Sequence, residues 1–152
     1  MTPAPLTPGP VITHGNGAEG QPQSLVFGVG IDLVQVDRLS AALVRQPSLR
    51  YRLFTSQEWG FAHRSNAGAD DSSAQLAMFF AAKESVMKAL GRGMNSMGFT
   101  EIEVQVGLQN QSRLHLSGRA AQRATELGIE SWQLSLARTE LMAQAVVIAL
   151  SQ

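Results

Sequence analysis

The pattern of hydrophobic and polar residues divides the chain into a tail without periodicity and a long regular region. Residues 1–24 hold five of the six prolines and show no repeating apolar pattern, which predicts a disordered tail. From residue 25 onward, apolar residues recur at strand and helix spacing. Residues 25–152 are therefore predicted to form a single domain, long enough to bury its own core.

The first regular segment, residues 25–34, is predicted to be a strand. One of its faces collects the large apolar side chains, which are Phe27, Val29, Ile31 and Leu33. The other face carries Gly28 and Gly30 and then Asp32. Because glycines have no side chains, we expect open space beside the Asp32 carboxylate, as a bulky ligand would need.

Apolar periodicity and capping sequences predict three helices in the middle of the chain. The first spans residues 38–46 and is capped by Asp37. The second spans about 56–64 and begins with a capping box from Thr55 to Glu58. The third is a long helix that begins with a second capping box at 72–75 and ends at Gly91. The first box gives Glu58 a structural role, so Glu58 is left out of the candidate site.

The second half of the chain is mostly strand. The predicted elements are a hairpin of 100–106 with 113–116, a helix at 118–127 closed by Gly128, and strands at 130–137 and 142–150. The element order β-α-α-α-β-β-α-β-β predicts an α+β fold with a largely antiparallel sheet.

Composition narrows the classes of function. The chain has no cysteine, which excludes disulfides and thiolate metal sites, and its formal net charge is zero, which argues against nucleic-acid binding through bulk charge. Residues 38–64 nevertheless hold five arginines against one acid, Glu58, and this local excess suits an acidic partner. The tail lacks the basic residues of a targeting signal and no apolar run is long enough to span a membrane, so a soluble cytoplasmic protein is predicted.

Lys83 and Lys88 are the chain's two lysines, and both lie in the predicted long helix. Glu84 and Lys88 are four residues apart and share a face, just before the glycine-flanked turn 91–93. A magnesium-bound phosphate needs such a set, namely a carboxylate, a cation and exposed amides. A surface Glu–Lys pair worth about 0.2–0.5 kcal/mol is the alternative. Lys83 lies on the apolar side of the helix, so its chain is predicted to pack there and its ammonium to reach solvent.

Two separated segments together resemble a known family. Residues 28–33 read Gly-Val-Gly-Ile-Asp-Leu with Arg38 beyond them, and residues 80–84 read Phe-Ala-Ala-Lys-Glu, followed by Lys88 and the 91–93 turn. The chain resembles the phosphopantetheinyl transferases, in particular the short holo-acyl-carrier-protein synthase class, over about residues 25–150. The resemblance implies an enzyme that moves 4'-phosphopantetheine from coenzyme A to a serine of apo acyl carrier protein, releasing adenosine 3',5'-bisphosphate.

The resemblance also implies roles for individual residues, in a homotrimer with active sites between subunits. The implied set is Asp32 and Glu84 as Mg2+ ligands, Lys88 on the coenzyme phosphates, Gly91, Arg92, Gly93 and Arg138 at the coenzyme, and Arg38 and Arg45 toward the acidic carrier protein. Glu84, a metal-bound water and His63 are the candidates for the general base that activates the serine.

The chain departs from the family pattern at three places. Phe79 stands where the family often has an arginine, the usual Gly-Thr-Gly turn reads Gly-Arg-Gly at 91–93, and a late Ser-His pair reads Ala-Arg at 137–138. We hypothesise that Arg92, with Arg138 across a subunit boundary, replaces the missing charge. A non-catalytic coenzyme A or carrier-protein binding module is the competing class, and the presence of all three of Asp32, Glu84 and Lys88 counts against it.

Overall fold

The computed structural model of the chain describes residues 25–64, 69–91, 96–108 and 111–152. The predicted tail at 1–24 and the two turn residues Arg92 and Gly93 lie outside the described residues.

The predicted α+β class is confirmed, and the strands form two antiparallel sheets. β1 (Leu25–Gln35), β5 (Met142–Ser151) and β4 (Ile129–Arg138) form a three-stranded sheet in the order β1-β5-β4. β2 (Ile102–Val106) and β3 (Ser112–Leu116) form a separate hairpin. The predicted pairing of the hairpin strands is therefore confirmed.

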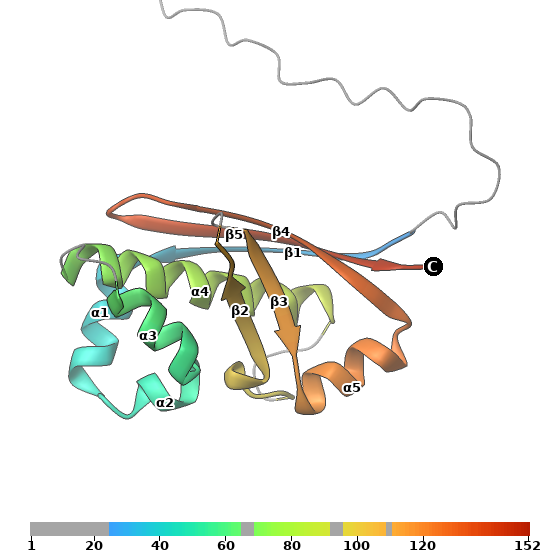
Figure 1. Ribbon diagram of the computed structural model, residues 1–152, viewed down its shortest axis with the longest axis horizontal. Helices are drawn as coiled ribbons and strands as arrows, with labels where there is room; N and C mark the ends of the chain where they lie inside the picture. Colours follow the sequence, from blue (N-terminus) through green and yellow to red (C-terminus); the bar gives the residue numbers. More distant parts are fainter. Residues whose placement is uncertain (1–24, 65–68, 92–95, 109–110) are drawn as a thin grey trace, which may run out of the picture.

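The helices lie on one side of the three-stranded sheet. They are α1 (Val36–Arg45), α2 (Leu49–Leu53), α3 (Ser56–Arg64), α4 (Ala69–Ala89) and α5 (Gly118–Glu126), with a 3-10 turn, η1, at Phe99–Glu101. Figure 1 shows α4 lying lengthwise along the sheet, with α1, α2 and α3 on the side of α4 away from the sheet and the hairpin crossing α4 in this view. Because α4 is covered from both sides, it buries residues around most of its circumference, among them Phe79, Ala81, Ala82, Val86, Met87 and Ala89. The face with Glu84 and Lys88 is left partly open.

Of the two helix starts that were predicted from capping boxes, one is confirmed and the other is wrong. The Thr55–Glu58 box is confirmed: the Thr55 amide donates to Glu58 Oε2 at 2.9 Å, and the Glu58 amide donates to Thr55 Oγ1 at 3.2 Å. The second predicted box is wrong, because α4 already begins at Ala69. Ser72 lies inside this helix and donates its hydroxyl to the Ala62 carbonyl at 2.8 Å, which joins α4 to α3.

Two further boundaries differ from the prediction. α1 begins at Val36 with Gln35 at the N-cap position, so Asp37 lies in the first turn, where its charge favours the positive end of the helix dipole, and is not the cap. The short helix α2 was not predicted at all, because five residues give too little periodicity to detect. At the other end of α4, Gly91 has φ +67°, which confirms it as the residue that ends the long helix.

The glycine face of β1 is packed against α4, so Gly28 and Gly30 do not supply the open space predicted beside Asp32. Asp32 does border open space, but this space is a cavity at the end of that face. A Cβ on Gly28 would lie 2.5 Å from the Ala89 carbonyl oxygen, and a Cβ on Gly30 would overlap the Ser85 carbonyl oxygen. The two glycines let the strand approach the helix backbone. The apolar face of β1 points the other way: Phe27, Val29, Ile31 and Leu33 are between 43% and 60% exposed.

Of the described helices, including the 21 residues of α4, none has the length and hydropathy that crossing a membrane requires.

Candidate functional site

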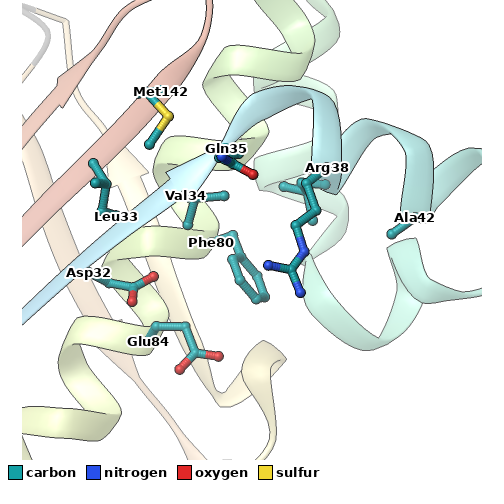
Figure 2. Close-up of a pocket in the computed structure, with 10 residues that line it drawn as sticks. Asp32, Leu33, Val34, Gln35, Arg38, Ala42, Phe80, Glu84 and Met142 are labelled. Atoms are coloured by element: carbon teal, nitrogen blue, oxygen red, sulfur yellow. The ribbon is translucent and has the colours of Figure 1, made fainter.

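Asp32 and Glu84 line one cavity of about 610 Å3. Asp32 comes from β1, Glu84 from α4, and Arg38 of α1 lies across from them. Figure 2 shows both carboxylates facing the space that also holds the Phe80 ring and the Arg38 guanidinium. The structure therefore brings together three of the side chains that the sequence singled out.

The close contact between β1 and α4 places the two carboxylates side by side. Gly30 admits the Ser85 carbonyl, and Ser85 is next to Glu84 in the helix. The Ser85 hydroxyl also donates to the Ala145 carbonyl at 3.2 Å, and Ala145 is paired with Asp32 in the sheet. Since Asp32 is two residues after Gly30, it lies on the same side of the strand and faces α4.

Lys88 bonds across the two elements and not along its own helix. Its Nζ lies 2.8 Å from Asp32 Oδ1 and donates to the Ile31 carbonyl oxygen at 2.8 Å. The alternative of a surface pair within the helix, with Glu84, is therefore wrong. The Lys88 side chain is 50% exposed and that of Asp32 18%, so the ammonium lies at the open edge of the site.

The two carboxylates are incompletely neutralised. Burial raises the pKa of Glu84, the nearby negative charge of Asp32 raises it further, and Lys88 acts in the opposite direction. A divalent cation between the carboxylates would relieve this repulsion. Within the described ranges, there is no group of three or more His, Cys, Asp or Glu side chains that could hold a metal, so the pair would supply two ligands. Mg2+ suits such a site, because it usually keeps several waters and takes phosphate oxygens as further ligands.

The two predicted partner-binding arginines have different surroundings. Arg38 lines the cavity with Asp32 and Glu84. Arg45 is in the last turn of α1 and is exposed. Arg38 therefore shares a cavity with the two carboxylates, whereas Arg45 lies on the outer surface of α1.

Other predicted residues lie away from this cavity. Arg138, at the end of β4, pairs through Nη2 with Asp71 Oδ1 at 2.6 Å and lines a separate hollow of about 130 Å3. His63 donates through Nδ1 to the Trp59 carbonyl at 2.8 Å and stacks on the Trp59 ring, so its place on α3 is explained by local contacts. Phe79 is fully buried against the Phe61 ring.

The prediction that the Lys83 ammonium reaches solvent is wrong, and the assignment of Glu58 to a cap alone is incomplete. Both side chains are 0% exposed, with Lys83 Nζ 2.7 Å from Glu58 Oε2. Burial raises the pKa of Glu58 and lowers the pKa of Lys83, and their mutual attraction opposes both shifts. The scarcity of lysine was the signal for this pair, but nothing in the spacing pointed to Glu58.

Comparison with known proteins gives a consistent set of similarities. The family model of the 4'-phosphopantetheinyl transferase superfamily matches residues 28–146. The holo-[acyl-carrier-protein] synthase of Streptomyces avermitilis is 42% identical over 124 residues, covering 82% of this chain and 97% of the relative. The protein of the same name from Streptomyces coelicolor is 43% identical over 124 residues, with the same coverage of 82% and 97%.

Solved structures extend the comparison. The holo-(acyl-carrier-protein) synthase of Bacillus anthracis in complex with CoA (3',5'-ADP) matches with a TM-score of 0.68 and 25% identity, over 84% of this chain and 98% of that chain. The Chronobacterium ammoniagenes ACPS-CoA complex matches with a TM-score of 0.70 and 26% identity, over 82% and 97%.

Proposed function

Because the chain belongs to the holo-[acyl-carrier-protein] synthases of the 4'-phosphopantetheinyl transferase superfamily, and is therefore an enzyme, we propose that Asp32, Glu84 and Lys88 form its active site. The reaction is transfer of 4'-phosphopantetheine from coenzyme A to a serine of an apo acyl carrier protein. One observation carries the site assignment. Asp32 and Lys88 are 56 residues apart in sequence, yet they bond to each other beside a cavity that Asp32 shares with Glu84.

The pair of carboxylates is proposed to hold Mg2+ against the coenzyme A pyrophosphate. The raised pKa of Glu84 supports this assignment, because it reflects negative charge that a cation would neutralise. When bound, the metal would supply charge neutralisation on the phosphates. Phosphoryl transfer depends mainly on such positioning and electrostatic stabilisation.

Lys88 is proposed to stabilise the leaving group. An ammonium has three donors, and two of those on Lys88 reach Asp32 and the Ile31 carbonyl. The remaining donor at the open edge of the site suits a phosphate oxygen. As the serine oxygen bonds to the pantetheine phosphorus, the bond from that phosphorus to the bridging oxygen breaks, and negative charge passes to adenosine 3',5'-bisphosphate.

The serine proton needs an acceptor. Glu84 suits this role, since its carboxylate faces the cavity that the serine would have to enter. A metal-bound water is the alternative acceptor. His63 is the third candidate, but its hydrogen bond to the Trp59 carbonyl gives it a local role on α3 and does not support a role in proton transfer.

The coenzyme site is proposed to extend from the end of α4. Gly91 ends this helix in a left-handed conformation, and Arg92 and Gly93, which follow it in the sequence, are proposed to contact the coenzyme with it. Arg138 is proposed to contact the coenzyme bound to a neighbouring subunit. Its guanidinium would then have to leave Asp71 or contact Asp71 and the coenzyme at the same time.

Arg38 and Arg45 are proposed to receive the acidic carrier protein along α1. Their chemistry supports this, because exposed cations steer an acidic partner toward a site. Arg38, which lines the cavity, would guide the serine-bearing segment of the carrier protein, and the exposed Arg45 would contact the carrier-protein surface farther from the cavity.

We place the reaction in the cytoplasm.

We propose that the enzyme is a homotrimer. The support is the apolar face of β1, where four large side chains are 43% to 60% exposed in one chain. Contiguous exposed apolar surface of this kind marks a contact with another molecule.

Mass spectrometry of apo acyl carrier protein, incubated with coenzyme A and Mg2+, tests the function. We expect a mass gain of one phosphopantetheine with the wild-type chain, and no gain with Asp32→Ala or Glu84→Ala. Stable binding of both substrates by the wild-type chain without a mass gain would instead identify a binding module. Near-normal turnover by either variant at limiting Mg2+ would contradict the metal assignment.

A further inference from the structure

A buried ion pair includes the residue next to Glu84 in the sequence. Lys83 is next to Glu84 in α4, and its contact with Glu58 of α3 at 2.7 Å is fully enclosed. Taking two ions out of water is costly, and well-packed apolar residues often stabilise a core equally well. Stability alone is therefore a weak reason for this pair, which suggests that it fixes a particular arrangement of its neighbours.

The pair connects four elements through hydrogen bonds. Glu58 Oε2 accepts from the Thr55 amide at 2.9 Å, and Glu58 Oε1 accepts from the Val104 amide of β2 at 2.8 Å. Lys83 Nζ donates to the Phe99 carbonyl of η1 at 2.9 Å. The two side chains thus hold α4 against α3, β2 and η1 at once.

Phe99 extends this connection to the cavity. Its ring stacks on that of Phe80, with centroids 5.4 Å apart and planes 14° apart. Phe80 lines the cavity and precedes Glu84 by one helical turn. Figure 2 shows the Phe80 ring beside the Glu84 carboxylate and the Arg38 guanidinium. Lys83 is therefore connected to the site in two ways, through its neighbour Glu84 in the helix and through the Phe99–Phe80 stack.

We propose that Lys83 and Glu58 are positioning residues for phosphopantetheine transfer, which hold Glu84 and the Phe80 wall of the cavity in place. This inference rests on the proposed function. Without the Lys83 ammonium, the Phe99 carbonyl loses its donor and the ring stack loses its anchor. Phosphoryl transfer is sensitive to such changes, because a misplacement of about 1 Å can slow an enzyme about 100-fold.

The first test is Lys83→Met, which keeps an unbranched side chain and removes the ammonium. At a temperature where the variant is folded, we expect kcat to fall by about 10- to 100-fold. We expect KM for coenzyme A to change by less than about threefold, and the Mg2+ concentration for half-maximal turnover to rise. Independently of turnover, NMR of labelled phenylalanine should show the loss of ring-current shifts from the Phe80–Phe99 stack.

Two further variants separate positioning from stability. Val147→Ala truncates a fully buried side chain on β5 and serves as the control for lost stability. Phe99→Leu leaves the ion pair and the backbone contact of Lys83 intact but removes the stacked ring. If the ring stack positions the site, we expect Phe99→Leu to show the same fall in kcat as Lys83→Met, with a smaller loss of stability.

Two results would overturn the proposal. The first is a Phe99→Leu variant with the kcat of the wild-type chain. The second is a Lys83→Met variant that needs no more Mg2+ than the wild-type chain for half-maximal turnover and has the same kcat as Val147→Ala at equal stability. If Lys83→Met does not fold, Phe99→Leu decides alone. If the wild-type chain transfers no phosphopantetheine, the proposed function fails, while the NMR comparison still reports whether the ion pair holds the ring stack.

Discussion

At the scale of single residues, the charges around Glu84 favour ligand binding over the stability of the free protein. Burial and the neighbouring Asp32 carboxylate both disfavour the ionised form of Glu84. Lys88 bonds to Asp32, so its charge offsets only part of this repulsion. Destabilised groups of this kind are common in active sites, where they trade stability for function.

The first prediction concerns the pH dependence of stability. The pKa of Glu84 in the folded chain is raised above its ordinary value of 4.5, so the folded state holds this proton to higher pH than the unfolded state. The contribution of Glu84 to stability is therefore full below pH 4.5 and is lost as pH rises through the folded pKa. Without divalent cations, Glu84→Gln should melt at a higher temperature than the wild-type chain at pH 7, with the difference shrinking toward pH 4.

Thermal unfolding followed by circular dichroism between pH 4 and pH 8 measures this effect. Glu130→Gln, which removes an exposed carboxylate on β4, is the matched control. Equal melting temperatures for the wild-type chain and Glu84→Gln at every pH would show that Glu84 experiences no net repulsion in the folded protein.

The second prediction concerns Lys88. Lys88→Ala removes a half-exposed side chain, so the fold should persist. If the ammonium stabilises charge that develops in the transition state, kcat should fall by about 100-fold or more, while KM for coenzyme A rises far less. Steady-state kinetics with Lys88→Arg as the charge-preserving control makes the comparison. A rise in KM at constant kcat would assign Lys88 to substrate binding.

At the scale of elements, the site depends on how closely β1 approaches α4. Gly30→Ala would drive a methyl group into the Ser85 carbonyl, so strand and helix must separate. Overpacking of this kind costs about 1–3 kcal/mol, and backbone obstruction favours the upper end. Because Asp32 and Glu84 are on the two elements that separate, activity should fall together with stability.

Gly60→Ala is the control for this third prediction. Gly60 lies inside α3, where the nearest atom to an added Cβ is the end of the Arg64 side chain at 3.9 Å. Alanine is there expected to stabilise the protein by about 0.5–1 kcal/mol, since it favours the helix. Urea unfolding of both variants gives the comparison, and a neutral Gly30→Ala would mean that the helix moves without strain.

Much of this arrangement was predictable from the sequence, because local patterns determine it. The Thr55 capping box, the Gly91 helix end and the hairpin pairing all follow from residues close in the chain. The second capping box failed because Ser72 bonds to Ala62, a tertiary contact that competes with the local one. The ion pair of Lys83 with Glu58 was missed for the same reason: it joins residues 25 positions apart by packing alone.

The candidate site was predictable in its members but not in its contacts. Helical spacing puts Glu84 and Lys88 on one face, yet Lys88 bonds to Asp32, because the strand glycines bring β1 within its reach. The glycines of β1 were predicted to leave room for a ligand, but they allow close contact with the helix backbone. A position without a side chain is compatible with either role. Only the packing of α4 distinguishes the two.

At the scale of the whole molecule, the fourth prediction concerns self-association through the apolar face of β1. Val29 is 51% exposed on this face. A lysine there would place a charge at the centre of the proposed subunit contact, so Val29→Lys should dissociate the trimer. If the active sites lie between subunits, turnover should fall in step with the loss of trimer.

Light scattering after size-exclusion chromatography measures the mass of each species. Val44→Lys changes an apolar residue on α1 that is 76% exposed and lies off the sheet, so it should keep the wild-type mass. A wild-type chain that is monomeric and active would contradict the trimer proposal.

The distribution of lysine has a consequence for chemical modification of the protein. Lys83 is fully enclosed and Lys88 is half exposed, so among the side chains one amine per molecule is open to reagents. Limited acylation should therefore attach a single group to a lysine, and that group should sit in the proposed active site. Activity should disappear in proportion to labelling, coenzyme A should protect, and peptide mapping should locate the adduct at Lys88. Amine-coupled supports and crosslinkers that react at Lys88 would inactivate this enzyme for the same reason.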